Sequence, residues 1–183
     1  MLGDHRVREE HAAGARRGRP QGVQMANFFQ KMAAAAALAF VAVTPAAAQD
    51  WQLDPNFGTV TLISGFEPDP YNVNLIAGGD LQVATNISGC LGWITRQPDY
   101  RLHWQAGNLG LPLVISVTSN ADTTLVINGP DTRWYCDDDG GNVGLNPSIT
   151  FTSPASGQYD IWVGTYAPGN APAQLSISEL FSQ

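Results

Sequence analysis

Residues 156–166 read SGQYDIWVGTY, and this stretch gives the clearest indication of the fold. Tyr159, Ile161 and Val163 alternate with Asp160 and Trp162. A period of two places the first three side chains on one face of a β-strand and the other two on the opposite face. Trp162 therefore either packs under a loop or is exposed. An exposed aromatic ring on a flat sheet would bind a sugar or a protein partner.

Similar runs fill the rest of the chain after residue 48. Fifteen glycines and ten prolines divide residues 49–183 into short segments rich in β-branched and aromatic residues. None shows a helical hydrophobic repeat over three turns. We expect two antiparallel sheets packed face to face, or a closed barrel. The predicted strands are 57–64, 72–77, 81–85, 90–95, 100–106, 112–119, 123–128, 133–137, 147–153, 158–166 and 173–179.

The N-terminal 48 residues contain a segment typical of a secretory signal. Residues 25–48 combine Lys31, an apolar run over 32–43, a break at Pro45 and the Ala-Ala-Ala cleavage signal at 46–48. We predict a signal peptide over 25–48, cleaved between Ala48 and Gln49, rather than a membrane anchor. Residues 1–24 then form a gene-model extension or an unstructured leader, and 49–183 form one domain.

The charge distribution excludes several classes of ligand. Residues 49–183 carry 13 acidic residues against three arginines and no lysine, a net charge of −10. Nucleic acid and anionic membranes both require clustered basic side chains. We therefore expect no nucleic-acid partner and no membrane insertion after signal cleavage. The predicted location is periplasmic or secreted.

The only two cysteines, Cys90 and Cys136, both follow the export signal. An even count in an exported chain predicts a structural disulfide. A metal thiolate pair or a catalytic cysteine is the competing interpretation, although the spacing is far from C-x-x-C.

The most distinctive short motif is DDDGGN at residues 137–142. Adjacent carboxylates repel one another, and Ca²⁺ takes six to eight oxygen ligands. Asp137, Asp138, Asp139 and Asn142 are therefore candidate calcium ligands, with Asp122 as a further one. A solvated hairpin turn is the alternative, because Asp-Gly favours such turns by itself.

No catalytic residue is predicted. His103 is the single histidine after the leader, and it lies in the predicted strand YRLHWQA, where a packed or half-exposed role is commoner than a catalytic one. The motifs G-x-S-x-G and H-E-x-x-H are both absent from the sequence.

Residues 121–166, with DTTLVINGPDTRWYCDDDGG, NPSITF and SGQYDIWVGTY, resemble the bacterial pre-peptidase C-terminal domain. GFEPDP at 65–70 and GCLGWI at 89–94 extend the resemblance over most of 57–179. It implies a jelly-roll-like antiparallel β-sandwich without catalytic residues. Some relatives bind calcium through acidic loops, and others bind matrix proteins or carbohydrates.

The sequence thus favours an exported, non-catalytic binding or accessory module with a protein or carbohydrate ligand. A secreted peptidase or other hydrolase with an unrecognised active site is the alternative.

Overall fold

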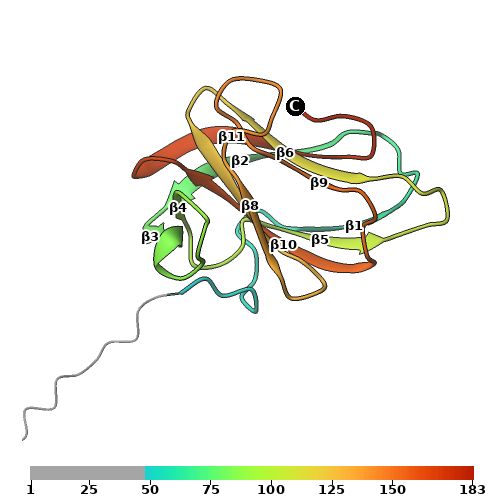
Figure 1. The fold of residues 1–183 in the computed structure, drawn as a ribbon, viewed down its shortest axis with the longest axis horizontal. Helices are drawn as coiled ribbons and strands as arrows, with labels where there is room; N and C mark the ends of the chain where they lie inside the picture. Colours follow the sequence, from blue (N-terminus) through green and yellow to red (C-terminus); the bar gives the residue numbers. More distant parts are fainter. Residues whose placement is uncertain (1–47) are drawn as a thin grey trace, which may run out of the picture. The chain divides into compact units, whose positions relative to one another are not determined.

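The computed structural model describes residues 48–183, which form eleven strands and one short 3-10 helix (Figure 1). The predicted leader and the residues before it lie outside this range. The elements are β1 (Thr59–Ile63), β2 (Tyr71–Gly79), β3 (Leu81–Gln82), η1 (Val83–Thr85), β4 (Trp93–Ile94), β5 (Tyr100–Gln105), β6 (Leu113–Ser119), β7 (Thr123–Asn128), β8 (Trp134–Asp137), β9 (Ser148–Phe151), β10 (Gly157–Thr165) and β11 (Gly169–Ser178). Within residues 48–183, no helix is long and apolar enough to cross a membrane.

The strands form two sheets that pack face to face as a sandwich (Figure 1). The four-stranded sheet has the order β2-β11-β6-β9. In the seven-stranded sheet, β1-β5-β10-β4-β3 form one path, and β7 joins β10 to β8. The predicted all-β sandwich is confirmed. One pair departs from the antiparallel pattern, because β1 runs parallel to β5 from Thr59 opposite Arg101 to Ile63 opposite Gln105.

The main core lies between the sheets and is built from the alternating positions seen in the sequence. Tyr159, Ile161 and Val163 of β10 face Leu175 and Ile177 of β11 within one apolar cluster, and all five are almost completely buried. Removing such side chains from water is the chief force holding the sheets together.

Strand β10 is also buried on its outer face. Trp162 is fully buried in a second apolar cluster with Cys90, Ile94 and Val126. The stretch between β3 and β4, with Val83, Ile87 and Cys90, covers this part of the sheet. Gly164 lets the Trp93 carbonyl of β4 approach, since a Cβ at Gly164 would lie 2.7 Å from that oxygen. Of the two possibilities for Trp162, packing under a loop is therefore correct.

The predicted disulfide is confirmed. Cys90, in the loop before β4, is bonded to Cys136 of β8 with a Cα–Cα distance of 5.6 Å. The bond fixes the covering segment to β8 beside buried Trp162. It therefore joins two parts of the chain that are 46 residues apart.

Replacing both cysteines with serine should destabilise the protein substantially. On the chain-entropy model, a loop of this length contributes roughly 4 kcal/mol, enough to lower Tm by on the order of 10 °C. Thermal unfolding of wild type and of the Cys90→Ser/Cys136→Ser variant, each with and without reductant, measures the effect. Equal melting temperatures in non-reducing buffer would contradict a stabilising role for the bond.

Candidate functional site

In the acidic turn, Asp137 stabilises the local backbone. Its Oδ2 accepts hydrogen bonds from the backbone N–H of Gly140 at 2.7 Å and of Ser148 at 2.9 Å. A side chain at position 140 would collide with this carboxylate, which explains the glycine there. Asp137 thus connects the end of β8 to the start of β9.

Asn142 interacts with the C-terminal residues. Its Nδ2 donates to the carbonyl oxygen of Ser182 at 3.0 Å, and its backbone N–H donates to that of Gln183 at 2.7 Å. Both the side chain and the main chain of Asn142 therefore fix the end of the chain against the turn.

Asp122, Asp138 and Asp139 influence one another electrostatically. Desolvation raises the pKa of Asp122, and the charges of Asp139 and Asp138 raise it further. Within residues 48–183, no three acidic, histidine or cysteine side chains are grouped in a way that would hold a metal ion. The calcium site accordingly stays a prediction.

His103 is exposed on β5. Its register neighbours are Thr61 on β1 and Gln158 on β10, both uncharged.

Among residues 48–183, Asp99 is the most deeply buried carboxyl group, with no exposed surface. It accepts hydrogen bonds from Asn56 Nδ2 at 2.9 Å and from the Val163 backbone N–H at 2.8 Å. Burial nevertheless raises the pKa of Asp99 to about 7, although the hydrogen bonds from Asn56, Val163 and Thr95 oppose the rise. Its backbone carbonyl accepts the N–H of Phe57, so Asp99 helps to hold the segment before β1.

A row of side chains crosses the outer face of the seven-stranded sheet. Arg101 of β5 lies opposite Asp160 of β10, and Asp160 lies opposite Asn128 of β7. Asn128 in turn lies opposite Trp134 of β8. Residues in register point to the same face of a sheet, so these four side chains from four strands lie side by side.

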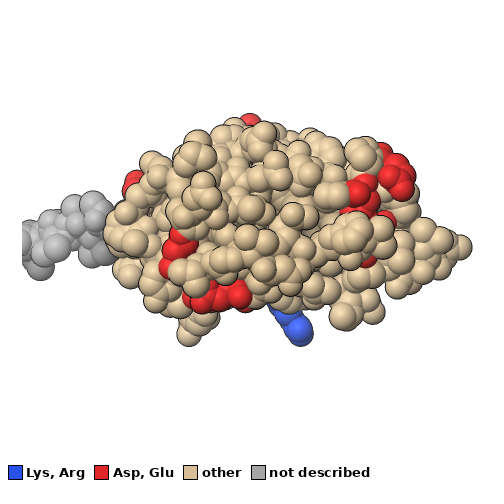
Figure 2. All heavy atoms as spheres, turned by 90° about the horizontal axis from the view of Figure 1, so that it is seen from above, with Lys and Arg blue, Asp and Glu red and all other residues tan. Residues whose placement is uncertain are grey.

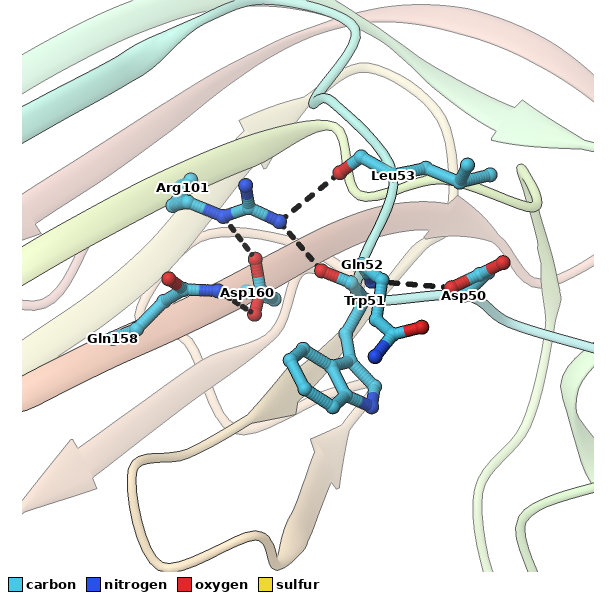
Figure 3. A network of polar contacts seen from close by, with 7 residues as sticks. All are labelled: Asp50, Trp51, Gln52, Leu53, Arg101, Gln158 and Asp160. Atoms are coloured by element: carbon cyan, nitrogen blue, oxygen red, sulfur yellow. Dashed lines mark hydrogen bonds and ion pairs between the residues drawn. The ribbon is translucent and has the colours of Figure 1, made fainter.

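Asp160 is held by two donors. Arg101 Nε donates to Asp160 Oδ1 at 2.6 Å, and Gln158 Nε2 donates to Asp160 Oδ2 at 2.7 Å (Figure 3). The side chains of Arg101 and Asp160 are only 14% and 3% exposed, so water screens this ion pair weakly. Both carboxylate oxygens therefore keep a fixed direction.

Arg101 also positions the segment that precedes β1. Its Nη2 donates to the carbonyl oxygens of Trp51 at 2.6 Å and Leu53 at 3.0 Å, as Figure 3 shows. One guanidinium group thus links β5, β10 and residues 51–53. Trp51 is held by its main chain, while its side chain is 46% exposed.

A groove of about 460 Å³ lies beside this network on the outer face of the sheet. Its volume is in the range of small-molecule sites, about 300–1,000 Å³. Trp134 packs on buried Trp162, with ring centroids 5.3 Å apart. The lining residues are Trp51, Asn128, Gly129, Pro130, Thr132, Trp134, Ser156, Gly157, Gln158 and Asp160.

The tip of the β7–β8 hairpin forms one rim of this groove and contains a strained residue. Thr132 has φ of 62°, a left-handed conformation that a β-branched side chain rarely adopts. The hairpin holds it there through hydrogen bonds from Thr132 N–H to the Gly129 carbonyl and from Gly129 N–H to the Arg133 carbonyl, both 2.9 Å. Such strain costs about 1–3 kcal/mol and tends to occur at functional sites.

A larger groove of about 550 Å³ lies over β2 and β11 of the other sheet. It is open and is lined by apolar and uncharged polar groups, including exposed Ile76 and the Gln174–Asn74 hydrogen bond. It has no buried charged group, so the groove beside Trp51 is the better candidate site.

The sequence did not indicate the Trp51 groove. Arg101 and Asp160 are 59 residues apart, and only the register of β5 with β10 brings them together. One signal was present: Asp160 lies on the same face of its strand as buried Trp162, and a carboxylate in such a place needs a cationic partner.

The sequence matches no protein-family model and no curated protein. Among solved structures, the chain is similar to PliG from Aeromonas hydrophila, a periplasmic inhibitor of g-type lysozyme. The two share 15% identity with a TM-score of 0.31, over 69% of this chain and 98% of that chain. A TM-score this low carries no inference about the present chain.

The calcium site predicted from the sequence implies that Ca²⁺ raises the melting temperature, by relieving repulsion among Asp122, Asp138 and Asp139. Extracellular calcium sites have Kd values of about 10⁻⁴–10⁻³ M, so millimolar Ca²⁺ should suffice and Mg²⁺ should do less. The Asp138→Asn/Asp139→Asn variant should lose the response. A wild-type Tm that stays constant up to about 10 mM Ca²⁺, above that Kd range, would leave only a solvated turn.

Burial of Asp99 should make stability depend on pH. Its pKa is about 7 in the folded protein against 3.8 for an unperturbed Asp, so between these values the folded state holds a proton that the unfolded chain has lost. The free energy of unfolding should therefore fall, by on the order of a few kcal/mol, as pH rises from about 4 to 7. Denaturant unfolding at several pH values should show a shallower fall in Asp99→Asn, whereas parallel profiles would exclude Asp99 as the source.

Proposed function

We propose that this protein is an exported, non-catalytic β-sandwich module that binds its ligand in the groove beside Trp51. The observation that carries the proposal is the network in which Arg101 fixes both Asp160 and the main chain of Trp51. Such a network orients polar groups before a ligand arrives, which reduces the entropy cost of binding.

The chemistry of the groove favours binding over catalysis. Asp160 is paired with Arg101 and also accepts a hydrogen bond from Gln158, so its carboxylate has fixed partners. A general base needs a partner acid or nucleophile within hydrogen-bond reach of a substrate. His103, the only histidine among residues 48–183, is exposed on β5 with uncharged neighbours in register.

Export is part of the same proposal. The Cys90–Cys136 disulfide is typical of proteins in oxidising compartments, which supports a periplasmic or secreted location. The resemblance to pre-peptidase C-terminal domains also supports a binding or accessory role. The ligand proposed here is an extracellular protein or carbohydrate.

Two assays on the exported protein test this function. Casein and fluorogenic peptide libraries should remain uncleaved, and the protein should be retained on at least one surface in a panel of immobilised extracellular proteins and polysaccharides. Cleavage that disappears in His103→Ala would favour the peptidase alternative. A protein retained on no surface would contradict a binding module.

A further inference from the structure

We propose that the groove between Trp51 and Trp134 binds a neutral saccharide. This inference rests on the binding function proposed above and specifies its ligand. A sugar ring has apolar C–H faces and a rim of hydroxyl groups. It therefore needs flat aromatic surface together with oriented acceptors and donors, and the groove supplies both kinds of group.

The aromatic part comes from two indoles on separate chain segments. Trp51 is 46% exposed although its main chain is fixed by Arg101, so its ring is presented without a mobile backbone. Trp134 is supported from beneath by Trp162, at a centroid distance of 5.3 Å. Both indoles line the groove and can stack on a ring, each at low entropy cost.

The polar part comes from the central strands. Each oxygen of Asp160 accepts one hydrogen bond, from Arg101 or from Gln158, and each has a further lone pair. The amides of Asn128 and Gln158 add acceptors and donors on the same wall of the groove. A carboxylate between two amides suits neighbouring hydroxyl groups, which can donate to one and accept from another.

The charge of the groove favours a neutral ligand. Asp160 is offset by Arg101, and Asp131 on the hairpin rim is offset by Arg133, with Nε and Oδ2 3.8 Å apart. The domain outside this region is strongly acidic, with a net charge of −10 over residues 49–183. An anionic ligand would be repelled by that field, and a cation would find its charge already matched inside the groove.

The position of the groove favours a saccharide over an extended peptide. A peptide that binds by strand addition needs the free edge of a sheet. The groove instead has its polar wall on β7 and β10, which are each hydrogen-bonded to a strand on both sides. Of its lining strands only β8, which carries Trp134, lies at the edge of the sheet. The polar wall consists of side chains, which suits a ligand whose hydrogen-bonding groups surround a ring.

Titration calorimetry on the exported protein tests the proposal with neutral cello-, xylo-, manno-, chito- and malto-oligosaccharides and with acidic oligogalacturonate. We expect at least one neutral series to bind and oligogalacturonate to bind at least tenfold more weakly. Trp51→Ala and Gln158→Ala should each weaken binding at least tenfold, and Trp51→Phe should restore part of it. Tyr166→Ala is the matched control, because Tyr166 is 48% exposed but does not line the groove.

Circular dichroism and thermal unfolding should show that each variant is folded, because Trp51 and Gln158 lie outside both buried clusters. The proposal is overturned if no neutral oligosaccharide binds, if oligogalacturonate binds best, or if Trp51→Ala and Tyr166→Ala bind equally well. Retention on a protein surface only, in the panel described above, would overturn the saccharide ligand while leaving the binding function in place.

Discussion

The ion pair between Arg101 and Asp160 is the constraint on which the outer face of this protein depends. It joins neighbouring strands β5 and β10, and Arg101 also holds the carbonyl oxygens of Trp51 and Leu53. Because both charged side chains are largely buried, loss of either one would leave the other unpaired, at a cost of about 3–5 kcal/mol. The sheet, the segment before β1 and the candidate groove therefore share one electrostatic anchor.

The outer face of the seven-stranded sheet has two regions. Around Trp162 the face is apolar and is covered by the segment that Cys90 attaches to β8. Around Asp160 it is polar and borders the groove, and Trp134 contacts both regions. Strand β10 therefore packs against apolar side chains on both faces along one part of its length, and along another part it lines the groove.

The sequence predicted most strands because alternation and turn residues are local properties. The predicted strand over 81–85 is wrong beyond Gln82, since Val83–Thr85 form a 3-10 helix. The predicted strand over 123–128 matches β7, and Tyr159, Ile161 and Val163 share one face of β10, as the alternation indicated. The parallel pairing of β1 with β5 could not be predicted, since a hydrophobic pattern carries no information about strand direction. The groove was missed for a related reason: its walls come from residues 51, 128–134 and 156–160, which only the sheet register unites.

Figure 2 shows acidic side chains in separate patches on a mostly uncharged surface with little basic area. The DDDGGN motif is the most distinctive short motif of the sequence, but Asp137 and Asn142 have defined structural partners in the turn. The groove, by contrast, gave no local motif, because its charges are paired and its aromatic residues come from distant segments.

Whether Arg101 fixes the Trp51 segment can be measured by ¹⁵N relaxation in wild type and in Arg101→Lys. Lysine preserves the charge opposite Asp160 but lacks the planar fork that also reaches the Trp51 and Leu53 carbonyls. We predict order parameters of about 0.85 for the amides of residues 51–53 in wild type and below about 0.6 in the variant, with β7 and β8 unchanged. Equal order parameters in the two proteins would show that Arg101 does not fix residues 51–53.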